Sequence, residues 1–182
     1  MSTKTNAPAW AKEMMALVAT RYPVVNEFTL EWSDRTDKLE WRAQYSSGIC
    51  KFTGNVLKVR AGTAVTDQVH VLLHELAHAA VGNDAAHEME WAVVNADLQN
   101  WLGDLQHAAT FCGYRSTRAA AKLYGVEVRY RIKPSEVEQY EMPETSAQKV
   151  LMRVRREAKA LSTPPATPGP EVQPAVEEEV AA

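Results

Sequence analysis

One short segment constrains this chain more than any other, because it places two metal-binding side chains one helical turn apart. The segment reads HELAH over residues 74–78, inside a proline-free stretch that runs from residue 66 to residue 80. Residues four apart lie on one face of a helix, so the imidazoles of His74 and His78 can reach the same ion. Zinc accepts neutral imidazole nitrogens, and the Glu75 carboxylate can take a proton from a zinc-bound water. This pattern is typical of a zinc peptidase.

The residues around the motif predict the helix that the motif requires. Thr66 or Asp67 can cap the start of the helix, and Gly82 offers a place for it to end. In a chain of this length and composition the motif is expected by chance only about 0.01 times. The apolar residues expected to supply core contacts are Val71, Leu72, Leu73, Leu76, Ala77 and Ala80.

A catalytic zinc site usually has three protein ligands and a water, so a third ligand is expected outside the motif. A turn is predicted over residues 82–84, and His87 follows at the start of a second helical stretch. A helix that ends and doubles back can return a side chain to the metal, and we expect His87 to be the third ligand. The carboxylates that could replace it are those of Asp84, Glu88 and Glu90.

The motif, the glycine-containing turn and His87, with Trp91 four residues later, resemble the SprT-like (Spartan-related) zinc metallopeptidases, a family with many short phage and bacterial members. The resemblance covers mainly residues 48–91. It implies a zincin-type domain that holds Zn²⁺ through the three histidines named above, with Glu75 as general base.

Two features depart from the family pattern. Glu88 follows the third histidine where SprT-like proteins usually have glycine, and the cysteine-rich zinc ribbon of longer members is absent from the sequence. The metzincin pattern fits less well, since it needs glycine and histidine where this chain has Val81 and Asp84.

The alternation of polar and apolar residues predicts an α+β fold. The elements expected before the motif helix are a helix over 8–22, strands over 27–32 and 39–45, and a hairpin of 48–53 and 56–61 around Gly54 and Asn55. This order gives a small antiparallel or mixed sheet packed on helices. In zincin folds the edge strand beside the active site pairs with extended substrate, and we expect residues 56–61 in that role.

A second long helix is predicted over residues 87–109. Its core stripe consists of Trp91, Val94, Leu98, Trp101 and Leu105. Trp91 is expected beneath the metal site, where it would restrict the ligand rotamers. His70, one turn before the first ligand, is expected at the surface or in support of the ligands, and His107 is expected to stand alone as a structural residue.

The remaining chain divides by composition. A short helix is predicted over 115–124, closed by Gly125, and a strand over 126–133. We expect a zincin-like domain over 1–133, a linker and basic helix over 134–161 with the helix at 146–161, and a disordered tail over 162–182. That tail contains five prolines, four glutamates and no lysine or arginine.

The chain of 182 residues, 46% apolar, can build one domain with its own core. It contains no long apolar run, so we expect neither a signal peptide nor a membrane span. We therefore expect the protein to be cytoplasmic, and to lie in the host cytoplasm if it is encoded by a phage. Cys50 and Cys112 lie far apart, which argues against a disulfide framework. Both are expected to be buried and apolar in character.

The net charge of -3 hides a segregation of charge. Residues 113–161 contain 11 Lys/Arg and 6 Asp/Glu, whereas residues 1–112 contain 9 and 13, and residues 162–182 contain none and 4. A positive segment attracts phosphate, and the family resemblance implies an association with DNA. The alternative is a solvated face, and the acidic tail could compete with nucleic acid for the basic segment. The candidate contacts are Arg115, Arg118, Arg129 and Arg131.

These observations lead to the expectation of a zinc metalloendopeptidase that acts on a protein or peptide substrate, with DNA as a further partner. The alternatives are a non-proteolytic nucleic-acid-binding or scaffold protein that retains the fold, and a zinc-dependent hydrolase of a non-peptide amide. Glu75 argues against the scaffold, because a structural zinc site needs no carboxylate at that position. The tyrosines that could stabilise an oxyanion are Tyr45, Tyr114, Tyr124 and Tyr130.

Overall fold

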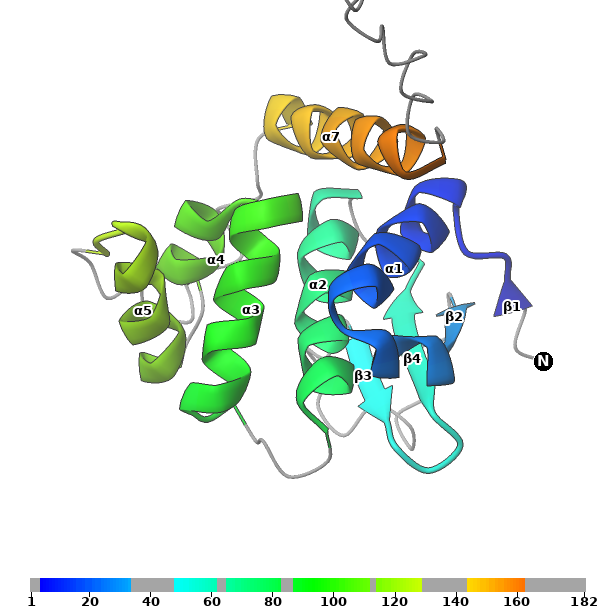
Figure 1. Cartoon of the computed structure of the whole chain (residues 1–182), viewed down its shortest axis with the longest axis horizontal. Coiled ribbons are helices and arrows are strands. Elements are labelled where there is room, and N and C mark those ends of the chain that lie inside the picture. Colours follow the sequence, from blue (N-terminus) through cyan, green and yellow to red (C-terminus); the bar gives the residue numbers. More distant parts are fainter. Residues whose placement is uncertain are drawn as a thin grey trace, which may run out of the picture.

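The computed structural model describes residues 4–33, 48–61, 65–82, 87–111, 114–128 and 144–162. It has an α+β fold in which helices predominate and a small mixed sheet lies to one side (Figure 1). The expected α+β class is therefore confirmed, and of the two sheet types expected, antiparallel or mixed, the sheet is of the mixed type.

Within the described residues, four strands form the sheet in the order β1, β2, β4, β3. They are β1 (Lys4–Thr5), β2 (Thr29–Ser33), β3 (Gly48–Lys51) and β4 (Val56–Arg60). β2 and β4 are parallel, and the other two pairs are antiparallel. Alternate residues of the central strands point into the core, where Trp32, Leu57 and Val59 are almost completely buried. The sheet thus has one apolar face, and the helices pack on it.

β3 and β4 form the predicted hairpin. Gly54 (φ 83°) and Asn55 (φ 48°) lie in its turn, and both backbones are left-handed, a conformation that favours glycine and asparagine. The expectation that residues 56–61 form the edge strand beside the site is wrong, because β4 lies between β2 and β3. Among the described strands, β3 (Gly48–Lys51) is the one at this edge of the sheet, and it contacts α2 (Val65–Val81).

Three helices surround the sheet side of the core: α1 (Ala9–Arg21), α2 (Val65–Val81) and α7 (Glu144–Ser162). α1 buries Met14, Leu17 and Val18. A 3-10 turn, η1 (Pro23–Glu27), then leads into β2. α7 includes the predicted helix 146–161 and packs mainly on α1, with Val150 and Val154 buried. α7 is therefore part of the core, and the division of the chain into domains remains a prediction.

The predicted single helix over 87–109 is wrong, because the structure has two helices there. α3 (Met89–Leu102) ends at Gly103, and α4 (Leu105–Phe111) follows. A Cβ at Gly103 would meet Leu73 Cδ1 at 2.7 Å, so glycine permits the close approach of this corner to α2. Asp104 Oδ1 then accepts a hydrogen bond from the His107 N–H at 2.9 Å, which caps the new helix.

The predicted helix over 115–124 consists of α5 (Arg115–Ala121) and a final 3-10 turn, η2 (Lys122–Tyr124), closed by Gly125 at φ 72°. No strand is assigned over residues 126–128, the described part of the strand predicted at 126–133. The rest of that strand, the strand predicted over 39–45 and the tail from 163 lie outside the described residues.

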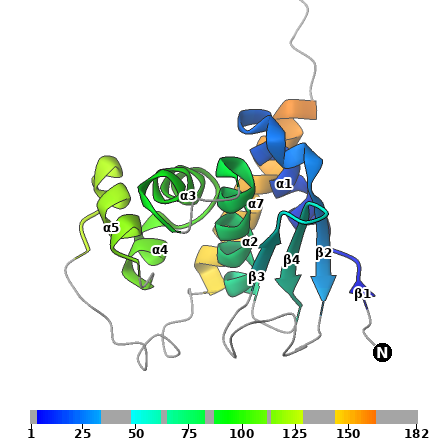
Figure 2. The same ribbon diagram turned by 90° about the horizontal axis from the view of Figure 1, so that it is seen from below.

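The elements are arranged in layers that place α2 at the centre (Figure 2). The sheet lies on one side of α1 and α2, α3 lies on the other side of α2, and α4 and α5 lie beyond α3. Within the described ranges, no helix combines the length and the apolar content that crossing a membrane requires.

Candidate metal centre

α2 positions the first two histidines because its packing fixes its rotation. Leu72, Leu73, Leu76 and Ala77 are fully buried between the sheet and α3, which leaves His74 and His78 on an adjoining, half-exposed face. The helix ends at Gly82, whose φ of 98° is left-handed and whose N–H bonds the His78 carbonyl at 3.0 Å. The predicted motif helix is therefore confirmed with nearly the predicted ends.

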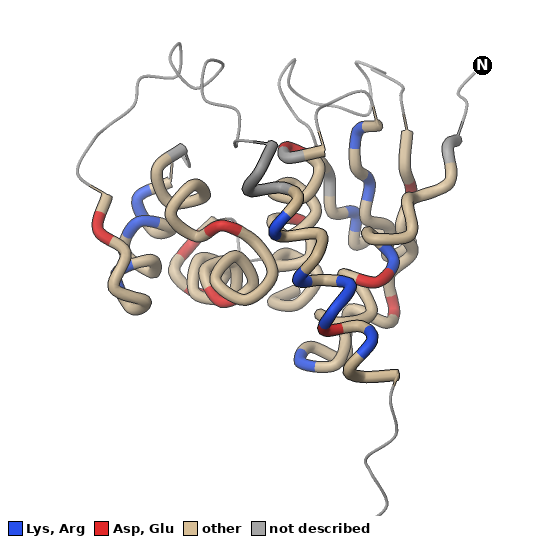
Figure 3. The backbone as a smooth tube through the Cα atoms, turned by 90° about the horizontal axis from the view of Figure 1, so that it is seen from above, with Lys and Arg blue, Asp and Glu red and all other residues tan. Residues whose placement is uncertain are grey.

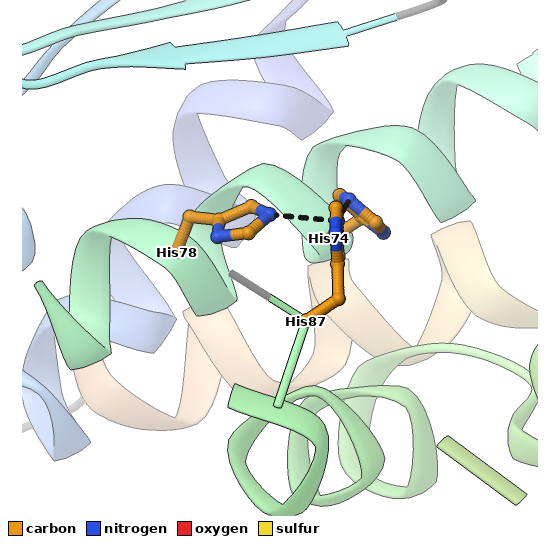
Figure 4. A group of neighbouring side chains, drawn as sticks. All are labelled: His74, His78 and His87. Atoms are coloured by element: carbon orange, nitrogen blue, oxygen red, sulfur yellow. Dashed lines mark hydrogen bonds between the residues drawn. The ribbon is translucent and has the colours of Figure 1, made fainter. Parts of the chain in front are cut away.

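His87 returns to these two side chains from the segment before α3 (Figure 4). Its Nε2 lies 3.0 Å from His74 Nε2 and 3.1 Å from His78 Nε2. The three histidines form the only group of at least three potential metal ligands found within the described residues. The prediction that His87 joins His74 and His78 is therefore confirmed in geometry.

The three nitrogens fit a cation better than they fit one another. A neutral imidazole Nε2 carries either one proton or one lone pair, so His87 Nε2 cannot bond fully to both neighbours. A tetrahedral zinc with Zn–N bonds of about 2.0–2.1 Å would separate its ligand nitrogens by about 3.3 Å, close to the spacing seen here. A metal ion can accept a lone pair from each of the three rings at once. Three histidine nitrogens alone do not determine the identity of the metal.

Burial keeps these imidazoles neutral, which is the form that binds metal. Burial, together with the smaller effect of the neighbouring histidines, lowers the pKa of His78 to about 4 and that of His74 well below 6.5. Burial also lowers the pKa of His87. Since the lone pair of each neutral ring is free to coordinate at neutral pH, protons compete weakly with a metal ion.

Trp91 supports the site from below, as predicted. Its indole is fully buried and lies 4.7, 5.2 and 4.6 Å, between ring centroids, from His74, His78 and His87. One aromatic side chain on α3 thus contacts all three candidate ligands. Such contact limits the rotation of the imidazoles and excludes water from one side of the site.

Glu75 lies between α2 and the edge strand β3. Its side chain is 6% exposed, and its carboxylate accepts a hydrogen bond from the backbone of Cys50. Burial raises the pKa of Glu75 to about 8, and the Cys50 bond opposes this rise. A Cβ at Gly48 would lie 2.6 Å from Glu75 Oε1, so only glycine allows this approach of strand and helix. The carboxyl group is therefore held in place and can exchange a proton near neutral pH.

The structure also places the other predicted residues. Glu88 and Glu90 are exposed and outside the histidine cluster, and Asp84 is outside the described residues. Of the four tyrosines considered for stabilising an oxyanion, Tyr114 stacks on the imidazole of His87, whereas Tyr124 donates a hydrogen bond to Asp97. Those outside the described residues are Tyr45 and Tyr130.

The two other histidines lie close to each other. His70 is half-buried, and its Nδ1 is a buried atom with no hydrogen-bond partner, so of the two positions expected for it the fully exposed one is not observed. His107 does not stand alone, since its ring packs edge-on against His70 at 5.9 Å between centroids. Burial lowers the pKa of His70 to about 4. Neither residue joins the ligand group.

Cys50 on β3 is only partly buried, less than expected, and burial raises the pKa of its thiol to about 12. Cys112 lies outside the described residues. Arg115 and Arg118 are on α5, exposed and half-exposed respectively, whereas Arg129 and Arg131 also lie outside the described residues. The described positions of the arginines therefore leave the nucleic-acid expectation open.

Sequence reasoning missed two contributors to the site and left the choice of a third open. Gly48 and Ser116 were not singled out, and Tyr114 was only one of several eligible tyrosines. Gly48 matters because β3 approaches α2 closely at this residue, and Ser116 because it faces the carbonyl of His87. Both contacts join distant parts of the chain, so no local sequence pattern marks them.

Comparisons with protein-family models, curated proteins and solved structures found no match.

Proposed function

We propose that this protein is a zinc-dependent endopeptidase of the SprT-like, zincin type. The observation that carries the proposal is the convergence of three imidazole nitrogens at 3.0–3.1 Å beside the buried carboxyl group of Glu75. When bound, zinc would polarise a scissile carbonyl and make a water acidic enough to be deprotonated near neutral pH.

The chain's own residues supply the remaining functions. His74, His78 and His87 would hold the ion, and Trp91 keeps their rings in position. Glu75 accepts a proton from the attacking water and later delivers it to the leaving amine. Its hydrogen bond to the Cys50 backbone and its contact with β3 fix the carboxyl group for both transfers.

A purified Glu75→Gln variant tests the chemistry. The variant should keep its zinc and its fold, measured by metal analysis and circular dichroism. Cleavage of an unfolded protein substrate should fall by about 10²–10⁴-fold, the contribution of a general base. Glu88→Gln is the matched control, since it alters an exposed carboxylate next to the third ligand and should retain activity. Unchanged cleavage by Glu75→Gln would refute the proposed mechanism.

The same preparation separates the alternatives. If the wild type binds zinc but cleaves no protein, a simple acyl-amide substrate distinguishes a non-peptide amide hydrolase from a scaffold. Hydrolysis of that amide, lost in Glu75→Gln, would support a non-peptide amide hydrolase. Zinc binding without hydrolysis of either substrate would support a scaffold.

We also propose that basic residues after position 113 bring the enzyme to proteins bound on DNA. The supporting observation is that α5, which carries Arg115 and Arg118, also contacts the third ligand through Tyr114. Basic residues of the described part of this segment occur on α5 and on α7, on either side of α3 (Figure 3). The exposed members on α7 are Lys149, Arg155, Arg156 and Lys159.

A salt titration tests this proposal. About four phosphate contacts would give a slope of about -3 to -4 when log affinity is plotted against log salt. Replacing Arg115, Arg118, Arg129 and Arg131 by glutamine should flatten the slope and leave the zinc content unchanged. The Arg155→Gln and Arg156→Gln double variant distinguishes α7 from α5 as the contact surface. No binding of DNA by the wild type at low salt would refute the proposal.

A further inference from the structure

The third candidate ligand differs from the other two because α2 does not hold it. His87 precedes α3, and its φ of 50° is left-handed, a conformation that is unfavourable for a non-glycine residue. A side chain in such a segment keeps one orientation only when its surroundings fix it. The contacts around His87 therefore decide how well the three nitrogens are pre-arranged for a metal.

Two residues at the start of α5 make these contacts, and we call them the α5 contact pair: Tyr114 and Ser116. The Tyr114 ring lies parallel to the His87 imidazole, with 3.9 Å between centroids and 12° between planes. Ser116 Oγ donates a hydrogen bond to the His87 carbonyl oxygen. One member thus covers a face of the imidazole, and the other fixes the backbone that carries it.

Trp91 completes the enclosure of the ring from another direction. Its indole meets the His87 imidazole almost at a right angle, 87° between planes. A ring bounded by one parallel and one perpendicular aromatic side chain has little freedom to rotate about its χ2 angle. The nitrogen that faces His74 and His78 is thereby kept facing them.

α5 is itself fixed to α3, the helix that carries Trp91. Thr117, Ala120 and Ala121 are fully buried on α5, and α5 has extensive contacts with α3. The Tyr124 hydroxyl, in η2, donates a hydrogen bond to Asp97 Oδ1 on α3 at 3.3 Å. Because α5 is fixed to α3, the α5 contact pair holds His87 in a fixed position relative to α3.

We propose that Tyr114 and Ser116 are positioning residues for the third metal ligand, so that metal affinity depends on the docking of α5. By reciprocity, metal binding strengthens the docking of α5 by the same factor. This inference rests on the proposed metal site, and it does not depend on whether the bound metal cleaves peptides.

The experiment measures zinc affinity by competition with a chromogenic chelator. Tyr114→Ala should weaken zinc binding by about tenfold, the lower end of the range for residues that support metal ligands. Tyr114→Phe keeps the stacked ring and should bind as the wild type does. Ser116→Ala should weaken binding by a smaller factor, because it frees the backbone but leaves the ring stacked.

Tyr22→Ala is the matched control for general loss of stability. Tyr22 is a partly buried tyrosine that bonds Asp97 at 3.2 Å and lies at the end of α1. Its removal should lower the melting temperature without weakening zinc binding. Equal loss of zinc affinity in Tyr22→Ala and Tyr114→Ala would overturn the proposal, since loosening of the fold would then explain both.

Hydrogen exchange supplies a second readout that does not involve activity. Zinc should slow amide exchange over residues 115–121 in the wild type, and this slowing should shrink in Tyr114→Ala. Wild-type affinity in Tyr114→Ala, or no effect of zinc on α5 exchange, would overturn the α5 proposal alone. If Tyr114→Ala does not fold, wild-type affinity in Ser116→Ala overturns it. Failure of the wild type to bind zinc would overturn the metal site as well.

Discussion

Replacement of Gly48 by alanine tests the contact between the edge strand β3 and Glu75, the proposed general base. A Cβ at this position would lie 2.6 Å from Glu75 Oε1, 2.8 Å from Glu75 Cγ, and closer still to Val71 Cγ1. Restoring the carboxylate oxygen to an ordinary contact of 3.4 Å requires about 0.8 Å of movement between β3 and α2. The valine cannot turn away easily, because a β-branched side chain in a helix has one strongly preferred rotamer.

This overpacking should destabilise the protein by about 1–3 kcal/mol. In a chain of this size each kcal/mol lowers the melting temperature by about 2–4 °C. A displacement of about 1 Å at a reacting group can reduce a rate by about 10²-fold. We therefore expect Gly48→Ala to keep its zinc, to melt several degrees lower and to lose about two orders of magnitude in kcat.

Thermal melting, metal analysis and peptidase kinetics on the folded protein measure these effects. Adding Val71→Ala to Gly48→Ala removes the closest clashing atom and should recover part of the stability, which a double-mutant cycle detects as non-additivity. Strictly additive stabilities, or full activity in Gly48→Ala, would refute the view that β3 holds the Glu75 carboxyl group in place.

His87→Ala should reduce zinc occupancy far more than His107→Ala, measured by metal analysis, and greater damage from Glu88→Ala or Glu90→Ala would show that a carboxylate is the third ligand. Asp104→Ala should lower the free energy of unfolding by about 1 kcal/mol, because α4 loses its cap, without changing zinc content; denaturant melts of Asp104→Ala and Asp104→Asn check this. The metal-free protein should become less stable as pH falls from about 6.5 to about 4. Burial lowers the pKa of His70 to about 4, so in this window the unfolded chain binds a proton that the folded chain excludes. Urea melts in chelator at pH 7 and pH 5 should show this slope, and His70→Leu should reduce it.

Local patterns predicted those parts of the molecule that depend on neighbours along the chain. The motif helix is set by its apolar residues and by Gly82, and the hairpin by Gly54 and Asn55. The pairing of His87 with the motif followed from the coordination chemistry of zinc and from a turn of the right length. Each of these features needs only a few consecutive residues to be specified.

Features that depend on distant contacts were not predicted. The central position of β4 results from its parallel pairing with β2, which the alternation of residues does not report. The break between α3 and α4 reflects the close approach of Gly103 to Leu73, a residue thirty positions away in the chain. The contact of His70 with His107 joins α2 to α4, two helices that are not consecutive in the chain. The contact of Tyr114 with His87 likewise depends on the docking of α5.

The position of Trp91 gives the candidate site an optical property as well as a structural one. The indole has the three imidazoles as neighbours, and a cation held by those rings would bring positive charge close to its π system. The emission of this one tryptophan, out of five in the chain, therefore reports on the ion directly. Replacing the other four by phenylalanine would make the protein a fluorescent sensor of its own metal content.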